Sequence, residues 1–205
     1  MFPLSGALLL PRGKLPLNIF EPRYLAMTED ALGEGRMFGM IQPDLARPEG
    51  PTGPALYRIG CLGRLVSFSE TEDGRFQIVL TGVARFAVAV ELEMRRGYRR
   101  VRADYSAYSD DLLLDPPAAT DRDTIETALR AYFTRAGIDA NWNAIQHMPD
   151  DILVVTLGML CPFEPLEKQA LLEAATEADR AAALLALLRM GASDQDEPGT
   201  RRTVS

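Results

Sequence analysis

The chain has 205 residues, of which 47% are hydrophobic and 25% are charged, and its net charge is −7. A globular chain of this size buries about 70% of its unfolded surface, so it needs neither disulfides nor a structural metal to fold. The acidic net charge argues against general nucleic-acid binding, which relies on many Lys and Arg contacts to phosphates.

The two cysteines, Cys61 and Cys161, lie far apart and form no Cys-x-x-Cys motif. This spacing predicts two buried free thiols in a reducing cytosol rather than a zinc or redox site. The longest apolar runs fall well short of the ~20 residues that a membrane span requires. The amino-terminal run is also too short for a signal peptide. We therefore expect a cytoplasmic protein that makes no membrane contact.

Residues 2 to about 108 read mostly as short strands separated by turn residues. Phe76, Ile78 and Leu80 alternate with other residues, which is typical of a half-buried strand, and Asp73-Gly74 predicts a hairpin turn. Because closure hides sheet edges, many short strands favour a closed or partly closed barrel, interrupted by one helix at about 22–33. The strand-like runs are FPL (2–4), ALLLP (7–11), LPLNIF (15–20), MFGMIQ (37–42), YRIGCLGRLVSFSE (57–70), RFQIVLTG (75–82), ARFAVAVELEM (84–94) and YRRVRADYSAY (98–108).

The second half of the chain has helical periodicity. Residues 123–137 carry apolar side chains at helical spacing, residues 149–161 are apolar on nearly all sides, and residues 163–190 predict one or two more helices that stop at Gly191. Residues 192–205 are polar and show no hydrophobic periodicity, which is typical of disorder. The sequence thus predicts an α+β chain with a β-barrel subdomain at 1–114, a helical bundle at 115–191 and a disordered tail at 192–205.

Phe-Glu-Pro occurs twice, at 20–22 and 163–165, each time before an apolar periodic segment. Proline at the first helical position loses no hydrogen bond, and the preceding carboxylate faces the positive end of the helix dipole. Both copies therefore predict helix starts. We expect Phe20 to pack on Leu25 as a hydrophobic staple, and we expect Glu167 to bond back to the cap of the second helix.

The sequence contains no recognisable catalytic motif. His147 is the only histidine, which excludes multi-histidine metal sites and weakens any Ser-His-Asp or Cys-His proposal. Gly-x-Ser-x-Gly, phosphate-loop and His-Glu-x-x-His motifs are absent, and the pairs Asp110–Asp111 and Asp150–Asp151 occupy turn or cap positions. We expect no metal, no cofactor and no catalysis. A peptidase that uses Lys168 is the least favoured alternative.

A basic segment near residue 100 suggests a second kind of ligand. If residues 96–102 form a strand, then Arg96, Tyr98, Arg100 and Arg102 share one face. A basic face with an aromatic residue could hold RNA through phosphate contacts and base stacking. The competing interpretation, which the acidic composition favours, is a solvated hairpin whose arginines pair with nearby carboxylates.

Four segments, at 2–32, 38–43, 59–86 and 163–185, resemble the amino-terminal substrate-binding domain of the Lon ATP-dependent protease. The most specific parts are LPLNIFEPRYLAM (15–27) and the later Glu-Lys-Gln followed by Leu-Leu-Glu. The resemblance implies a PUA-like pseudobarrel followed by a small helical bundle. The sequence departs from the family at its start, where family members usually have a few more residues of the first strand. The ATPase and Ser-Lys protease residues of Lon are not found in this sequence.

By this resemblance we expect a noncatalytic module that recognises unfolded or tagged polypeptides and works with a Lon-type protease. Its candidate contact residues are Phe20, Glu21, Arg23 and Tyr24, at the start of the first helix. The RNA-binding and peptidase interpretations remain as alternatives.

Overall fold

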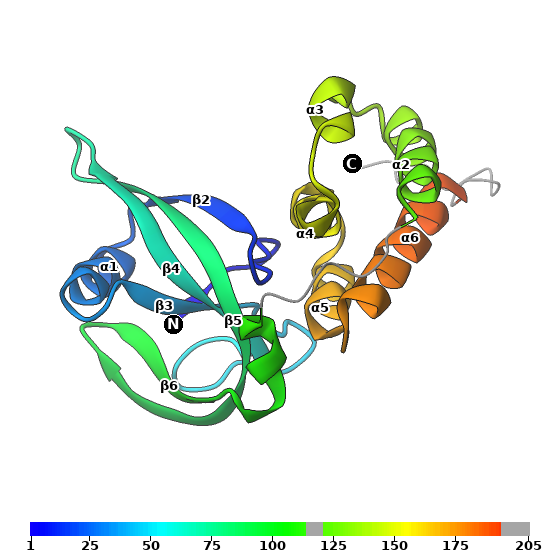
Figure 1. Cartoon of the computed structure of the whole chain (residues 1–205). Helices are drawn as coiled ribbons and strands as arrows, with labels where there is room; N and C mark the ends of the chain where they lie inside the picture. Colours follow the sequence, from blue (N-terminus) through cyan, green and yellow to red (C-terminus); the bar gives the residue numbers. More distant parts are fainter. Residues whose placement is uncertain (114–120, 194–205) are drawn as a thin grey trace, which may run out of the picture.

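The computed structural model describes residues 1–113 and 121–193 and shows a curved sheet beside a helical bundle (Figure 1). The strands are β1 (Phe2–Pro3), β2 (Lys14–Ile19), β3 (Met37–Ile41), β4 (Ile59–Glu70), β5 (Phe76–Arg95) and β6 (Tyr98–Asp104). The helices are α1 (Pro22–Gly33), η1 (Ser106–Leu112, a 3₁₀ helix), α2 (Arg122–Ala136), α3 (Trp142–Gln146), α4 (Asp150–Leu160), α5 (Pro165–Glu173) and α6 (Glu177–Ser193). The predicted α+β class is confirmed. The expected boundary at 114/115 and most of the expected tail fall outside the described residues.

The sheet is organised around the 20-residue strand β5. The strand order is β1-β3-β4-β5-β2, and β6 pairs with the second half of β5. Register shifts in β4 at Leu62/Gly63 and Leu65/Ser67 mark bulges, which bend a strand and increase its twist. The backbone nitrogen of Met1 donates to the Arg99 carbonyl at 2.9 Å and brings the two ends of the sheet together on one side.

Two of the predicted strand runs have a different structure. Residues 7–11 form no strand. Leu8, Leu9 and Leu10 are nevertheless fully buried, because Arg12 turns the chain with a φ of 67° and its backbone N–H bonds to Gly82 of β5. Residues 105–108 were expected to continue the last strand; instead Tyr105 caps η1 and residues 106–108 form its start.

Both Phe-Glu-Pro segments begin helices, as predicted, but they do so differently. Glu21 caps α1 without a side-chain hydrogen bond. Phe20, which was expected to pack on Leu25, is 62% exposed, so its ring lies outside the core. The Phe20 ring lies instead 6.0 Å from the Arg75 guanidinium. At α5 the Glu164 N–H donates to the Glu167 carboxylate at 2.7 Å, which confirms the predicted return bond.

The helical bundle is held by leucines and aromatic residues that face inward. Leu184 and Leu188 of α6 are fully buried. Helix α6 continues past Gly191 to Ser193, although Gly191 was expected to end it. A Cβ on Gly191 would lie 2.5 Å from the Tyr132 ring, so this glycine allows α2 and α6 to pack closely.

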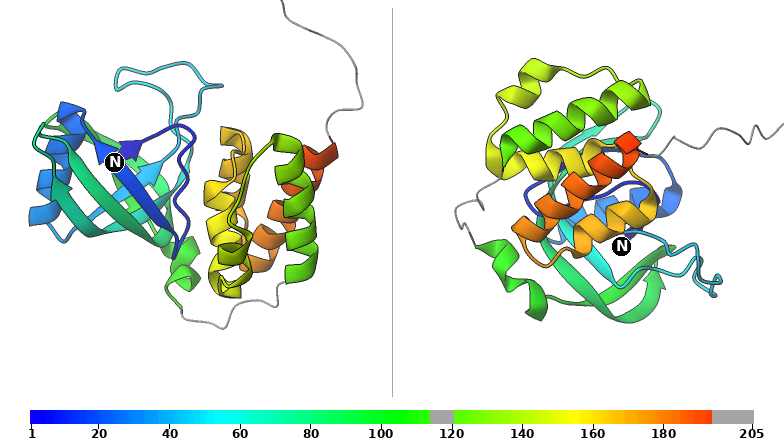
Figure 2. Two further views of the ribbon diagram at one scale, coloured as in Figure 1. Left: turned by 90° about the horizontal axis from the view of Figure 1, so that it is seen from above. Right: turned by 90° about the vertical axis from the view of Figure 1, so that its right-hand side faces the viewer.

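Helix α5 joins the bundle to the sheet (Figure 2). The Lys168 ammonium donates to the Gly6 carbonyl at 2.6 Å. The Gln169 amide donates to the Ile59 carbonyl at 3.2 Å and accepts from Gln42 at 3.1 Å. The Glu-Lys-Gln sequence at 167–169 thus caps its own helix and ties it to three segments of the barrel, at Gly6, Gln42 and Ile59.

A buried arginine completes this junction. Arg85 of β5 binds Asp111 of η1 through two N–H groups at 2.8 and 2.9 Å, and their side chains are only 6% and 9% exposed. The same guanidinium also donates to the carbonyls of Leu172, Ala174 and Ala175, where α5 ends. Asp111 was expected to occupy a turn or cap position, and its pairing with Arg85 was not foreseen because the arginine lies on a distant strand.

Candidate functional site

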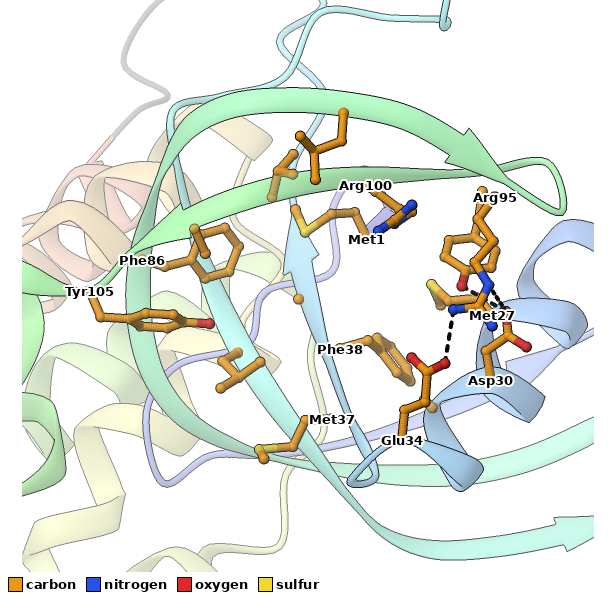
Figure 3. A pocket seen from close by; sticks show the side chains of 17 residues that line it. Met1, Met27, Asp30, Glu34, Met37, Phe38, Phe86, Arg95, Arg100 and Tyr105 are labelled. Atoms are coloured by element: carbon orange, nitrogen blue, oxygen red, sulfur yellow. Dashed lines mark hydrogen bonds and ion pairs between the residues drawn. The ribbon is translucent and has the colours of Figure 1, made fainter.

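A pocket of about 260 Å³ opens between α1, β3 and the curved β5–β6 ribbon (Figure 3). It lies on the barrel, away from the junction with the bundle. Its apolar lining comes from Met1, Met27, Ala31, Met37, Phe38, Gly39, Leu62, Phe86, Leu92, Val101 and Ala103. Its polar lining comes from Asp30, Glu34, Arg95, Tyr98, Arg100 and Tyr105.

The Phe86 ring forms the pocket floor and is 1% exposed. Two glycines make room for it: a Cβ on Gly39 of β3 or on Gly60 of β4 would lie 2.9 or 2.6 Å from the end of the ring. The Tyr105 ring meets Phe86 edge-on, with 6.0 Å between centroids. The sheet therefore supplies a rigid aromatic floor.

Methionines supply much of the remaining apolar surface. Met1 and Met27 are buried, whereas Met37 is 38% exposed at the start of β3 and lines the pocket (Figure 3). Methionine is unbranched and polarisable, so a surface made of it adapts to side chains of different shapes. The lining suits a binding site that accepts several apolar groups.

The α1 side of the pocket carries charges that satisfy one another. Asp30 accepts hydrogen bonds from Tyr98 at 2.7 Å and Arg96 at 2.9 Å, and it lies 3.2 Å from Arg95. Arg95 also donates to Glu34 at 2.8 Å. Burial and the bond to Asp30 raise the pKa of Tyr98 to about 12, and the bond from Tyr98 lowers the pKa of Asp30. This cluster fixes the β5–β6 hairpin to α1.

Two polar groups of the pocket have no such partners. Arg100 is exposed on β6, and among the described residues no side chain forms an ion pair or hydrogen bond with it. Within the same described part of the chain, the Tyr105 hydroxyl forms no hydrogen bond either. In Figure 3 the Arg100 guanidinium lies beside Met1 and the Tyr105 hydroxyl points into the pocket. Both donors are therefore available to a ligand.

The residues proposed from the first Phe-Glu-Pro segment do not line this pocket. Phe20, Glu21 and Arg23 lie at the opposite end of α1, where Arg23 pairs with Glu21 at 2.8 Å. Tyr24 is only 5% exposed; its ring lies 4.3 Å from that of Phe2 and 4.6 Å from the Arg23 guanidinium. Tyr24 therefore contributes to the core, whereas Phe20, Glu21 and Arg23 remain on the surface.

The expected Arg–Tyr face does not form as one surface. Arg96 lies in the turn before β6, with a φ of 47°, and pairs with Asp30 and Glu29. Tyr98 is 7% exposed and hydrogen-bonded. Arg100 and Arg102 are exposed on β6, but only Arg100 borders the pocket. The expectation of four residues on one strand face was wrong, because the β5–β6 turn takes up the first of them.

Of the pocket residues, only Tyr98 and Arg100 were candidates from the sequence; the others were missed because they come from separate segments of the chain. Met27, Met37, Phe86 and Tyr105 have nothing in common along the chain and meet only when the sheet curls. The available signal was Gly39, inside a predicted strand, since glycine there often marks a place where another group approaches closely.

No catalytic constellation is present among residues 1–113 and 121–193. His147 is exposed at the end of α3. Lys168 bonds to the Gly6 carbonyl rather than to a hydroxyl. Cys61 and Cys161 are buried free thiols, as predicted, and burial raises the pKa of both. In this part of the chain no three His, Cys, Asp or Glu side chains gather as metal ligands, and no helix has the length and hydropathy to cross a membrane.

The fold and its pocket define a small two-part binding domain, and comparison with known proteins gives its family. The model of the ATP-dependent protease La (LON) substrate-binding domain matches residues 1–190. The chain belongs to this family, which confirms the resemblance found in its sequence.

Solved structures with the same fold are amino-terminal domains of Lon. The Lon N-terminal domain protein from Xanthomonas campestris has a TM-score of 0.60 and 22% identity, with 90% of this chain and 95% of that chain covered. The N-terminal domain of Mycobacterium avium complex Lon protease has a TM-score of 0.59 and 16% identity, with 95% and 97% covered.

Curated relatives are whole Lon proteases that match over a short part of their length. Lon protease 2 of Myxococcus xanthus is 30% identical, and Lon protease of Anaeromyxobacter dehalogenans is 28% identical, each over 104 residues. Each match spans 51% of this chain but only 12% of the relative. What is similar is therefore the region of the substrate-binding domain.

Proposed function

We propose that this chain is a noncatalytic module that binds unfolded or tagged polypeptides through the methionine-lined pocket. The observation that supports this most is an apolar pocket with a rigid floor and an adaptable rim, in a chain of the substrate-binding family. The described residues also lack any arrangement of nucleophile, base and metal that would support hydrolysis. Relatives named as proteases are much longer chains, and the matched segment is only 12% of one of them.

The size of the pocket favours side chains over large ligands. Drug-sized molecules occupy pockets of about 300–1,000 Å³, whereas this pocket measures about 260 Å³. It suits one or two apolar side chains of an extended segment, which an unfolded polypeptide exposes and a folded one buries. Adaptable methionine surfaces bind such groups with broad specificity.

The proposed setting is the cytoplasm, with a Lon-type protease as the machine that receives the bound polypeptide. The exposed start of α1, with Phe20, Glu21 and Arg23, is a second contact surface in this proposal, for the polypeptide or for the protease. RNA binding is less well supported, because Tyr98 is buried and Arg96 is already paired.

A matched pair of methionine substitutions tests this function. Met37→Gln replaces a thioether in the pocket, and Met94→Gln makes the same change at an exposed β5 position outside it. Fluorescence anisotropy of a labelled, unstructured apolar peptide should show affinity about fivefold weaker for Met37→Gln, since roughly 1 kcal/mol of apolar burial is lost. Met94→Gln should bind as the wild type does. Equal affinities for all three proteins, or no binding, would count against the proposal.

A further inference from the structure

We propose that the pocket selects the carboxyl terminus of a polypeptide, with an apolar last residue on Phe86 and the α-carboxylate on Arg100. This inference rests on the proposed function and adds the chemical class of its ligand. It starts from the two unpartnered donors of the pocket, Arg100 and Tyr105, which the polypeptide-binding role alone does not explain.

The charges around the pocket set the orientation of such a ligand. On the α1 side, the carboxylates of Asp30 and Glu34 are held by Arg95 and Arg96. A carboxylate that approached this side would be repelled by the two acids and would find their arginines occupied. Arg100 offers five N–H donors in a planar fork. The ligand carboxylate is therefore expected on the β6 side of the pocket.

The apolar lining and the guanidinium border the same small space. Met37, Phe86 and Arg100 all line one pocket of about 260 Å³, so one ligand residue that carries both an apolar side chain and a carboxylate can contact both kinds of surface. In a carboxy-terminal residue both groups hang on one Cα. In an extended internal segment the next side chain points to the opposite face, so an acidic neighbour would point away from Arg100. The α-carboxylate is the source that fits.

A single guanidinium also matches the charge of this ligand. A carboxylate carries one negative charge and accepts two parallel N–H bonds from one guanidinium fork. A phosphate carries up to two charges at neutral pH. Besides Arg100, the described lining holds the amino group of Met1, which has no carboxylate partner, but burial lowers the pKa of this group to about 5, so it is neutral at pH 7. The carboxylate is thus preferred over a phosphate group.

Two labelled peptides that differ only in their carboxy-terminal group test the inference. Both have the same unstructured sequence ending in leucine, one as the free acid and the other as the amide, and a third carries the same leucine internally. Anisotropy with the full chain should show the free acid binding about fivefold more tightly than the amide or the internal peptide, a modest ion-pair effect. Added salt should narrow the difference.

Two arginine substitutions on one strand complete the design. Arg100→Gln should abolish the preference for the free acid, whereas Arg102→Gln, exposed on β6 but outside the pocket, should keep it. Free acid and amide binding equally, while Met37→Gln still weakens both, would overturn this inference and leave the proposed function standing. Absence of binding for all three peptides would overturn both.

Discussion

The junction between barrel and bundle and the pocket on the barrel use similar residue types in opposite ways. At the junction Arg85 makes bonds to a carboxylate and three carbonyls, and Lys168 and Gln169 each bond to a barrel carbonyl. In the pocket the Arg100 guanidinium and the Tyr105 hydroxyl have no hydrogen-bond or ion-pair partner among the described residues. Buried arginines with full partners hold two parts together, and an accessible arginine without one is available for binding.

The apolar side chains of the bundle and of the pocket also differ in how rigidly they pack. Leucines such as Leu171 and Leu184 fill the core of the bundle and are fully buried. Methionine lines the pocket, and Met37 remains partly exposed. Close packing of branched side chains fixes one arrangement, whereas methionine allows several. The leucine core therefore holds one arrangement, whereas the methionines of the pocket can adjust to ligand side chains of different shapes.

The largest expected effect comes from breaking the junction at Arg85. Arg85→Gln leaves Asp111 buried without a cation, and the loss of one partner of a buried pair costs about 3–5 kcal/mol. Urea unfolding should show this loss in the free energy of unfolding. Arg64→Gln, at an exposed position on the neighbouring strand β4, should change it by less than about 0.5 kcal/mol.

A double substitution sharpens the same test. Arg85→Met combined with Asp111→Leu removes both charges, so it should be less destabilising than Arg85→Gln alone. A double variant that is as unstable as the sum of the two single variants would show that the carbonyl bonds of Arg85, rather than its pairing with Asp111, stabilise the junction.

A smaller effect is expected where a methyl group enters the pocket floor. In Gly39→Ala the new Cβ would lie 2.7 Å from the Met1 sulfur and 2.9 Å from the Phe86 ring. Overpacking of this kind costs about 1–3 kcal/mol, and displacement of the Phe86 ring should also weaken peptide binding. Gly33→Ala at the end of α1 meets nothing within 4 Å and should leave both stability and binding nearly unchanged.

The junction was partly readable from the sequence, because its helix starts obey local rules. Pro165 and Glu167 predicted both the start of α5 and its capping bond, and the structure has both. The sequence did not show that Lys168 would bond to Gly6 or that Arg85 would bind Asp111. Those contacts join residues far apart in the chain, and no periodicity encodes them.

The pocket was not readable from the sequence, because curvature rather than pattern creates it. The alternation in residues 76–80 predicted the buried face of β5, but not that this strand and the next predicted run form one continuous bent strand. The turn residue Arg96 shifted the expected Arg–Tyr face, so Tyr98 points toward Asp30. Local patterns thus predict elements, and pairing across the bend determines the site.

The smallest expected effect concerns the wall of the pocket at Asp30 and its dependence on pH. The hydrogen bond from Tyr98 lowers the pKa of Asp30 in the folded protein, so this group stabilises the fold above its ordinary pKa of about 3.9. That contribution is lost as the pH falls through the lowered value. Urea midpoints measured from pH 7 to pH 3 should therefore decline less for Asp30→Asn than for the wild type, although the variant starts from a lower midpoint. If the urea midpoints of both proteins decline in parallel, the Asp30 carboxylate does not hold the β5–β6 hairpin against α1. That side of the pocket would then be able to shift as its methionines can.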